Sequence, residues 1–146
     1  MDKIGAYLTP DHRHCDGYFS TAEAAALQSD WDAAAIQLDQ FLSAMQQHFT
    51  KEETVLFPAF EQCTHHTEGP TEVMRMEHTQ MRELFQDLQQ ALVSHNASTY
   101  AGASETLLIL MQQHNLKEEQ MLYRMCEQML ARESGDLIER MQSIVQ

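Results

Sequence analysis

The chain has 146 residues, and its 9 Lys and Arg against 22 Asp and Glu give a formal net charge of −13. Because so acidic a surface repels phosphate groups, we expect no binding to nucleic acid or to an anionic membrane. The length suits a single domain over residues 1–146. Its 8 His and 10 Met are the unusual counts, and the excess of His needs an explanation.

The cysteines and the apolar segments indicate a compartment. Cys15, Cys63 and Cys126 form no CxxC pair, which disfavours a disulfide framework and a thiolate zinc site. The N-terminal segment lacks the apolar core of a signal peptide, and the aliphatic run at 107–111 is too short to span a bilayer. We therefore expect a cytoplasmic protein in a reducing environment.

Apolar residues recur with helical spacing along the chain, which predicts an all-α protein. A first helix is expected over about 9–28, beginning at a Thr-Pro pair. A second helix follows a capping box at 29–32, with Ser29 as its N-cap, and continues to about residue 60. Pro58 lies inside this pattern and is expected to interrupt its hydrogen bonding.

The second half of the chain repeats this organisation. A loop at 64–70 precedes a third helix over about 71–95, and Ser98 is expected to cap a fourth helix that reaches about residue 132. Together these elements predict an antiparallel up-and-down four-helix bundle with a short C-terminal extra helix. Polar side chains on the inner faces of such a bundle can converge at one height.

A repeated segment carries the strongest chemical signal. Residues 45–57 read MQQHFTKEETVLF and residues 111–123 read MQQHNLKEEQMLY, with eight of thirteen positions identical. In each copy a His precedes a Glu by four residues, so both side chains project from one helix face. One such pair is typical of a solvated surface, whereas two copies beside apolar neighbours indicate a face turned toward the core. The pairs are His48/Glu52 and His114/Glu118.

Two further histidines lie at matching heights on the other helices. Counted from the turn between the first two helices, His12 lies 17 residues back and His48 lies 19 forward. Counted from the turn between the last two long helices, His78 lies about 18 back and His114 about 17 forward. At about 1.5 Å per residue, the members of each pair differ in height by a few ångströms.

Four imidazoles and two carboxylates would meet in this arrangement. They exceed what one tetrahedral zinc ion needs, and each carboxylate can bridge two metal ions while the imidazoles serve as terminal ligands. The mixed nitrogen and oxygen set makes iron the first candidate, ahead of manganese or adventitious zinc. The candidate metal ligands are His12, His48, Glu52, His78, His114 and Glu118.

The order of these residues resembles the hemerythrin-like family of HHE cation-binding domains. The segments DHRHCD, HFTKEETVLFPAFE, VMRMEH and HNLKEEQMLY are similar to the four helices of that family, over about residues 8–130. The resemblance implies a bundle that holds a non-haem di-iron centre with an oxo or hydroxo bridge, and it assigns His12 as the ligand from the first helix.

The sequence departs from the oxygen-carrying hemerythrins at Met74. Those proteins show His-x-x-x-His on the third helix, and here Met74 occupies the first of the two positions before His78. Because a thioether is a poor ligand for iron, we expect one metal ion to lack a protein ligand and to leave room for a small molecule. This departure argues against simple reversible oxygen carriage.

The expected function is therefore binding or sensing of oxygen, nitric oxide or iron, by a monomer or homodimer. One alternative is an enzyme, either a di-iron oxidoreductase or a protein that repairs iron–sulfur centres, which would consume its substrate where a binder only saturates. The other is a metal-free helical interaction module, in which Glu52→Ala would barely alter stability.

Residues beside the candidate ligands carry weaker expectations. Glu53 and Glu119 point about 100° away from the ligand glutamates, so we expect them to pair with Lys51 and Lys117 or to orient a histidine. Tyr18 and Tyr123 are aromatic candidates near the site, and packing in the core is their default role. No metal role is expected for His14, His65, His66 and His95.

Overall fold

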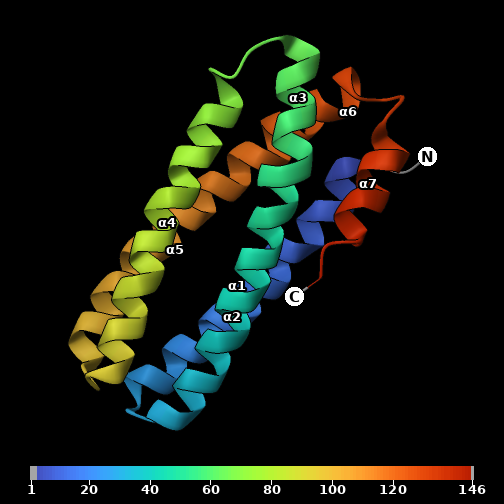
Figure 1. Cartoon of the computed structure of the whole chain (residues 1–146). Coiled ribbons are helices and arrows are strands. Elements are labelled where there is room, and N and C mark those ends of the chain that lie inside the picture. The colour runs from blue at the N-terminus through green and yellow to red at the C-terminus, as the bar shows by residue number, and fades with distance from the viewer. Residues whose placement is uncertain (1–2, 146) are drawn as a thin grey trace.

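The structure is a computed structural model that describes residues 3–145, and within this range the chain is helical with no strand. The chain forms four long helical arms, over residues 4–27, 31–64, 70–93 and 97–129, that run up and down, and a short helix follows at one end (Figure 1). The predicted four-helix bundle with a C-terminal extra helix is therefore confirmed. The elements in chain order are α1 (Ile4–Leu27), α2 (Trp31–Lys51), η1 (Glu52–Leu56), α3 (Phe57–Thr64), α4 (Pro70–Val93), α5 (Ala97–Lys117), η2 (Glu118–Leu122), α6 (Tyr123–Met129) and α7 (Ser134–Gln142).

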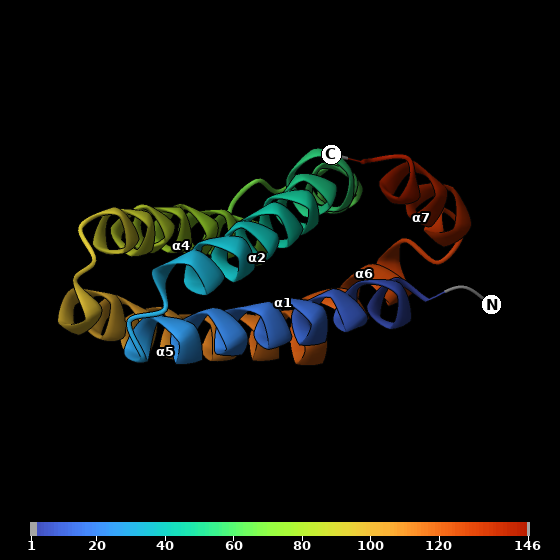
Figure 2. The same ribbon diagram turned by 90° about the horizontal axis from the view of Figure 1, so that it is seen from below.

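The arms pack as two hairpins. Helices α1 and α2 form one hairpin and α4 and α5 form the other, while α1 also packs on α5 and α2 on α4. Seen from below, α2 and α4 form one layer and α1 and α5 the other, with α7 beyond the end of the bundle (Figure 2). Every arm therefore has an inner face, and side chains from all four can meet between the layers.

The apolar core divides into two clusters. The turn-side cluster lies toward the α1–α2 and α4–α5 turns and includes Phe19, Phe41, Phe85 and Leu107. The α7-side cluster lies toward the other end and includes Ile4, Leu8, Val55, Met74, Leu122 and Met141. On each arm the predicted metal ligands lie where the residues of the turn-side cluster give way to those of the α7-side cluster, so the polar site lies in a band between two apolar ones.

The start of the first helix differs from the prediction. Helix α1 begins at Ile4, ahead of the Thr-Pro pair at 9–10, and Pro10 lies inside it. Burial explains the difference, because Ile4 and Leu8 are completely buried in the α7-side cluster and extend the apolar stripe. Only the hydrogen bond from position 10 to the carbonyl of Ala6 is lost, and Ala6 is exposed to water.

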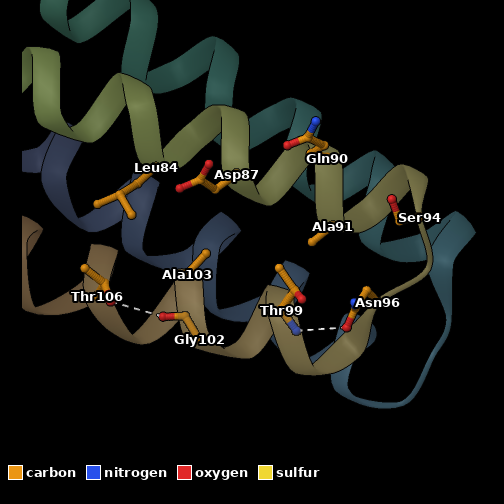
Figure 3. Close-up of a pocket in the computed structure, with 10 residues that line it drawn as sticks. All are labelled: Leu84, Asp87, Gln90, Ala91, Ser94, Asn96, Thr99, Gly102, Ala103 and Thr106. Carbon is orange, nitrogen blue, oxygen red and sulfur yellow. Dashed lines mark hydrogen bonds between the residues drawn. The ribbon is translucent and has the colours of Figure 1, made fainter.

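Two predicted caps are also wrong. Asp30, and not Ser29, accepts a hydrogen bond from the backbone of Ala33 at the start of α2, because Ser29 adopts a left-handed conformation with φ of 57°. At the start of α5 the cap is Asn96, whose side chain accepts from the backbone of Thr99 (Figure 3). Sequence alone offered two residues of good capping chemistry at each turn.

Among the described residues, none of the helices combines the length and apolar character that a membrane crossing requires.

Candidate metal centre

The predicted ligands converge in the bundle interior, in the band between the two apolar clusters. All four arms contribute, and none of the six side chains exposes more than 6% of its surface. Burying so many polar groups in one place is costly unless they are compensated. The residues brought together are His12, His48, Glu52, His78, His114 and Glu118.

One half of the cluster is built on His12 and His48. Their Nε2 atoms are 3.2 Å apart, and Glu118 Oε1 lies 3.0 Å from that of His12 and 3.8 Å from that of His48. Glu52 Oε1 lies 3.4 Å from His48 Nε2. These nitrogen and oxygen atoms are close enough to bind one ion together.

The other half is built on His78 and His114. His78 Nε2 lies 3.2 Å from Glu52 Oε1, and His114 Nε2 lies 3.3 Å from Glu118 Oε2. All four atoms are buried and none takes part in a hydrogen bond. Since buried polar atoms almost always have a hydrogen-bond partner, four such atoms gathered together indicate a place for a cation. Glu52 and Glu118 face both halves, as carboxylates that bridge two ions would.

The two inner glutamates lie where the helices widen. Glu52 and Glu118 each begin a five-residue π-helical turn, and the backbone N–H of Phe57 or Tyr123 closes it by donating to the glutamate carbonyl. In a π turn, positions five residues apart share a face. The turns therefore bring residues 57 and 123 to the inner face beside the glutamates. Continuous α-helix was the sequence expectation here, apart from an interruption at Pro58.

Four outer carboxylates fix the orientation of the imidazoles. Each accepts a hydrogen bond from the Nδ1 atom of one histidine, which leaves Nε2 facing the cluster. Contacts of this kind hold the rings in the orientation that a metal requires. The pairs are His12 with Glu119 (2.7 Å), His48 with Asp11 (2.9 Å), His78 with Glu53 (2.8 Å) and His114 with Glu77 (2.8 Å).

A two-fold relationship links the halves of the site. An offset of 66 residues converts Asp11-His12 into Glu77-His78 and the first copy of the repeat into the second. The hydrogen-bonded pairs obey the same offset. Asp11 and Glu77 were not among the sequence candidates, and the acid–His dipeptide repeated at this offset was the signal that could have found them.

Glu53 and Glu119 follow one of their two predicted roles, because each orients a histidine. Their predicted pairing with the adjacent lysines is wrong. The lysines contact the other two outer carboxylates, with Lys51 Nζ 3.8 Å from Asp11 Oδ2 and Lys117 Nζ against Glu77 Oε2.

The carboxylates change the proton affinity of the imidazoles. Burial alone would lower the pKa of His114, but the carboxylates of Glu118, Glu52 and Glu77 together outweigh it and raise that pKa to about 9. Burial is likewise outweighed at His48 and His78, chiefly by Glu52, and their pKa values are raised. Burial opposes ionisation of Glu118, yet the facing His114 holds its pKa well below the usual range. Metal binding must therefore displace protons from imidazoles.

Two further residues at the site differ from expectation. Tyr123 is 1% exposed but directs its hydroxyl into the cluster, 2.7 Å from Glu52 Oε2, where core packing was predicted. Met74 is buried in the α7-side cluster together with Leu8, its counterpart at the offset of 66 residues. Both halves therefore carry an apolar side chain one turn before the histidine of α1 or α4.

The remaining histidines lie outside the cluster, as predicted. His14, His65, His66 and His95 are all exposed. The ring of His95 stacks on Trp31, with centroids 5.2 Å apart, where it joins the two inter-helix turns. The excess of histidine noted in the sequence therefore divides into four buried at one site and four on the surface.

One cavity lies beside the candidate metal site and another lies at the far end of the bundle, and the two differ in the metal-binding side chains that line them. A cavity of about 150 Å³ between α1 and α2 reaches the outer side of His48, beside Cys15 and Lys51. A larger one of about 440 Å³ lies between the C-terminal half of α4 and the N-terminal half of α5 (Figure 3). Its lining has one carboxylate, Asp87, and no histidine, so it offers no comparable donor set.

Comparison with known proteins agrees with the geometry. The family model described as Hemerythrin HHE cation binding domain matches residues 4–126 of the chain. No curated protein and no solved structure gave a significant match.

Proposed function

Because the chain belongs to the hemerythrin HHE cation-binding family, we propose that its buried cluster holds two iron ions and binds or senses a small molecule there. His12 and His48 hold one ion and His78 and His114 the other. Glu52 and Glu118 lie between them as shared ligands. We further propose that residues 1–146 form one domain, and that the protein is cytoplasmic.

The observation that carries this proposal is the set of four buried atoms without hydrogen bonds. Glu52 Oε1, His78 Nε2, His114 Nε2 and Glu118 Oε2 are all held inward, and they are nitrogen and oxygen donors of the kind that iron accepts. A metal-free interaction module would leave these atoms with only the close His78–Glu52 and His114–Glu118 contacts, at 3.2 and 3.3 Å, and with no aligned hydrogen bond. A cation between them would bind all four atoms at once.

The residues around the ions determine what can enter. All six ligands are buried, so the surrounding helices shield the ions from bulk water and favour a small ligand. Iron in such a site supplies electron exchange and open coordination for oxygen or nitric oxide. The four outer carboxylates fix the imidazole rings by accepting hydrogen bonds from their Nδ1 atoms. Alternatively, the protein senses iron itself, and the loading or release of iron at this site is then the signal.

An anaerobic loading experiment tests the proposal. Metal-free protein is incubated with ferrous iron, desalted, analysed for iron, and its absorption spectrum is recorded before and after exposure to air. We expect about two iron ions per chain and a near-ultraviolet ligand-to-iron band after exposure. Glu118→Gln should retain fewer ions, while Glu105→Gln, an exposed carboxylate on the same arm, should behave as the original chain.

Two results would contradict the proposal. One is a chain that retains no iron after desalting. The other is equal iron retention by Glu118→Gln and Glu105→Gln, because the inner carboxylate would then have no role in binding.

A further inference from the structure

The two halves of the site differ at one buried aromatic position. Residue 57 is Phe in the first copy of the repeat, and the corresponding residue 123 is Tyr in the second. Both side chains are at most 1% exposed, and both follow a ligand glutamate by five residues at the end of a π-helical turn. One half of the site therefore contains an oxygen atom that the other half lacks.

The hydroxyl of Tyr123 lies among the donor atoms of the His12–His48 half. Its oxygen is 2.7 Å from Glu52 Oε2 and 3.0 Å from Glu118 Oε1. It is also 3.4 Å from the Nε2 atoms of both His12 and His48. Four inward-facing donor atoms from three arms thus surround this single oxygen.

These separations match those of ligands that share one ion. Donor atoms about 2.1 Å from a metal and at right angles to one another are about 3 Å apart. The contacts of the Tyr123 oxygen range from 2.7 to 3.4 Å, and the His12 and His48 nitrogens are 3.2 Å apart. The phenolic oxygen therefore lies at the spacing expected of a ligand in the same shell.

Hydrogen bonding alone accounts for only part of this arrangement. The hydroxyl carries one proton, so it can donate to Glu52 or to Glu118 but not to both. The hydroxyl proton therefore serves only one of these two close contacts. A cation shared by these atoms would make both contacts favourable.

We propose, as an extension of the proposed function, that Tyr123 binds the iron ion of the His12–His48 half directly through its phenolic oxygen. On binding, the O–H bond breaks, an oxygen–iron bond forms, and the proton passes to solvent, as for other protonated ligands. Tyr123 thereby supplies a ligand from the arm that otherwise contributes His114 and Glu118.

The proposal also assigns different roles to the two ions. Phe57 has no donor atom and stacks on His78, with ring centroids 5.6 Å apart. Met74, one turn before His78 on α4, lies in the α7-side cluster. The iron ion of the His78–His114 half therefore has fewer protein ligands, and an external small molecule binds to that ion.

The visible spectrum of the ferric protein tests the inference, because a phenolate bound to iron(III) gives a charge-transfer band that imidazole and carboxylate do not. We expect the full chain, loaded with iron and exposed to air, to show this band and tyrosinate ring vibrations in resonance Raman spectra excited within it. Tyr123→Phe should lose both signals. Tyr100→Phe is the matched control, since Tyr100 is equally buried and its hydroxyl has no hydrogen-bond partner.

The outcomes separate this inference from the proposed function. Iron bound at about two ions per chain without tyrosinate vibrations would overturn the role of Tyr123 and leave the iron site standing. Retention of the band in Tyr123→Phe would also overturn it. Failure of the chain to bind iron would overturn both. If Tyr123→Phe does not fold, the resonance Raman spectrum of the original chain decides alone.

Discussion

Replacement of Glu53 by Gln tests whether the outer carboxylates support the site. Glu53 Oε2 accepts a hydrogen bond from His78 Nδ1 at 2.8 Å, and Arg82 donates to both of its oxygens at 2.8 Å. Burial alone would raise the pKa of Glu53, but these bonds outweigh it and lower the pKa from 4.5 to about 2. Glu53→Gln keeps the shape of the side chain and removes its charge.

The lowered pKa of Glu53 gives the size of its contribution to the free energy of unfolding. A fall from 4.5 to about 2 corresponds to about 3 kcal/mol of stabilisation when the carboxylate is ionised. Exposure of the ion pair to water reduces this to about 1–2 kcal/mol. Because the pKa is lowered on folding, the stabilisation is complete above pH 4.5 and is lost as the pH falls through about 2.

Urea unfolding of the metal-free variants is the assay. We expect Glu53→Gln to lower the free energy of unfolding by about 1–2 kcal/mol at pH 7, with a smaller difference from the original chain at about pH 3.5. Glu119→Gln is the matched control, because Glu119 also accepts from a histidine Nδ1, at 2.7 Å, but is more exposed. Equal losses in the two variants, or a Glu53→Gln loss independent of pH, would refute the reasoning.

The same variant makes a prediction about the metal. Without the charge of Glu53, the ring of His78 is held less firmly and its Nε2 is a weaker donor. Iron affinity should fall by about 10–100-fold, as is typical when such a supporting contact is removed. Competition with a chelator of known affinity measures this, and an unchanged affinity would show that Glu53 does not support the site.

Three further predictions follow from the site. In the metal-free protein, the charge on His114 stabilises the fold fully below the unfolded pKa of 6.5 and less as the pH rises through about 9. The urea concentration at the unfolding midpoint should therefore decrease as the pH is raised from 6.5 to about 9, and a constant midpoint would contradict the assignment. Iron at about 100 times its dissociation constant should add about 2.7 kcal/mol to the free energy of unfolding, and equal melting temperatures with and without a chelator would favour the metal-free module. Met74→Leu should keep its full iron content and change stability by less than about 1.5 kcal/mol, whereas loss of iron would show that the thioether is a ligand.

Much of the architecture followed from periodicity, because it depends on local geometry. The apolar spacing predicted the helical arms, and distances counted from the turns placed the four histidines at one height. The start of α1 could not be predicted in this way. Its first turn is stabilised by burial of Ile4 in the α7-side cluster, a contact with residues far along the chain.

The interior of the site was predicted less completely. A spacing of four between His and Glu fits an α-helix, and nothing in the repeat signalled the π-helical turns that begin at Glu52 and Glu118. Such turns are rare, and packing against the other arms must compensate for them. Without them the hydroxyl of Tyr123 could not be placed beside the carboxylates, so Tyr123 was expected near the site but with core packing as its default role.

Anomalous scattering from crystals of the iron-loaded protein, measured at the iron absorption edge, tests the central claim most directly. We predict two peaks in each chain, one beside the Nε2 atoms of His12 and His48 and one beside those of His78 and His114, with Glu52 and Glu118 between them. A single peak, or iron bound only elsewhere on the chain, would contradict a two-iron centre built by the repeat.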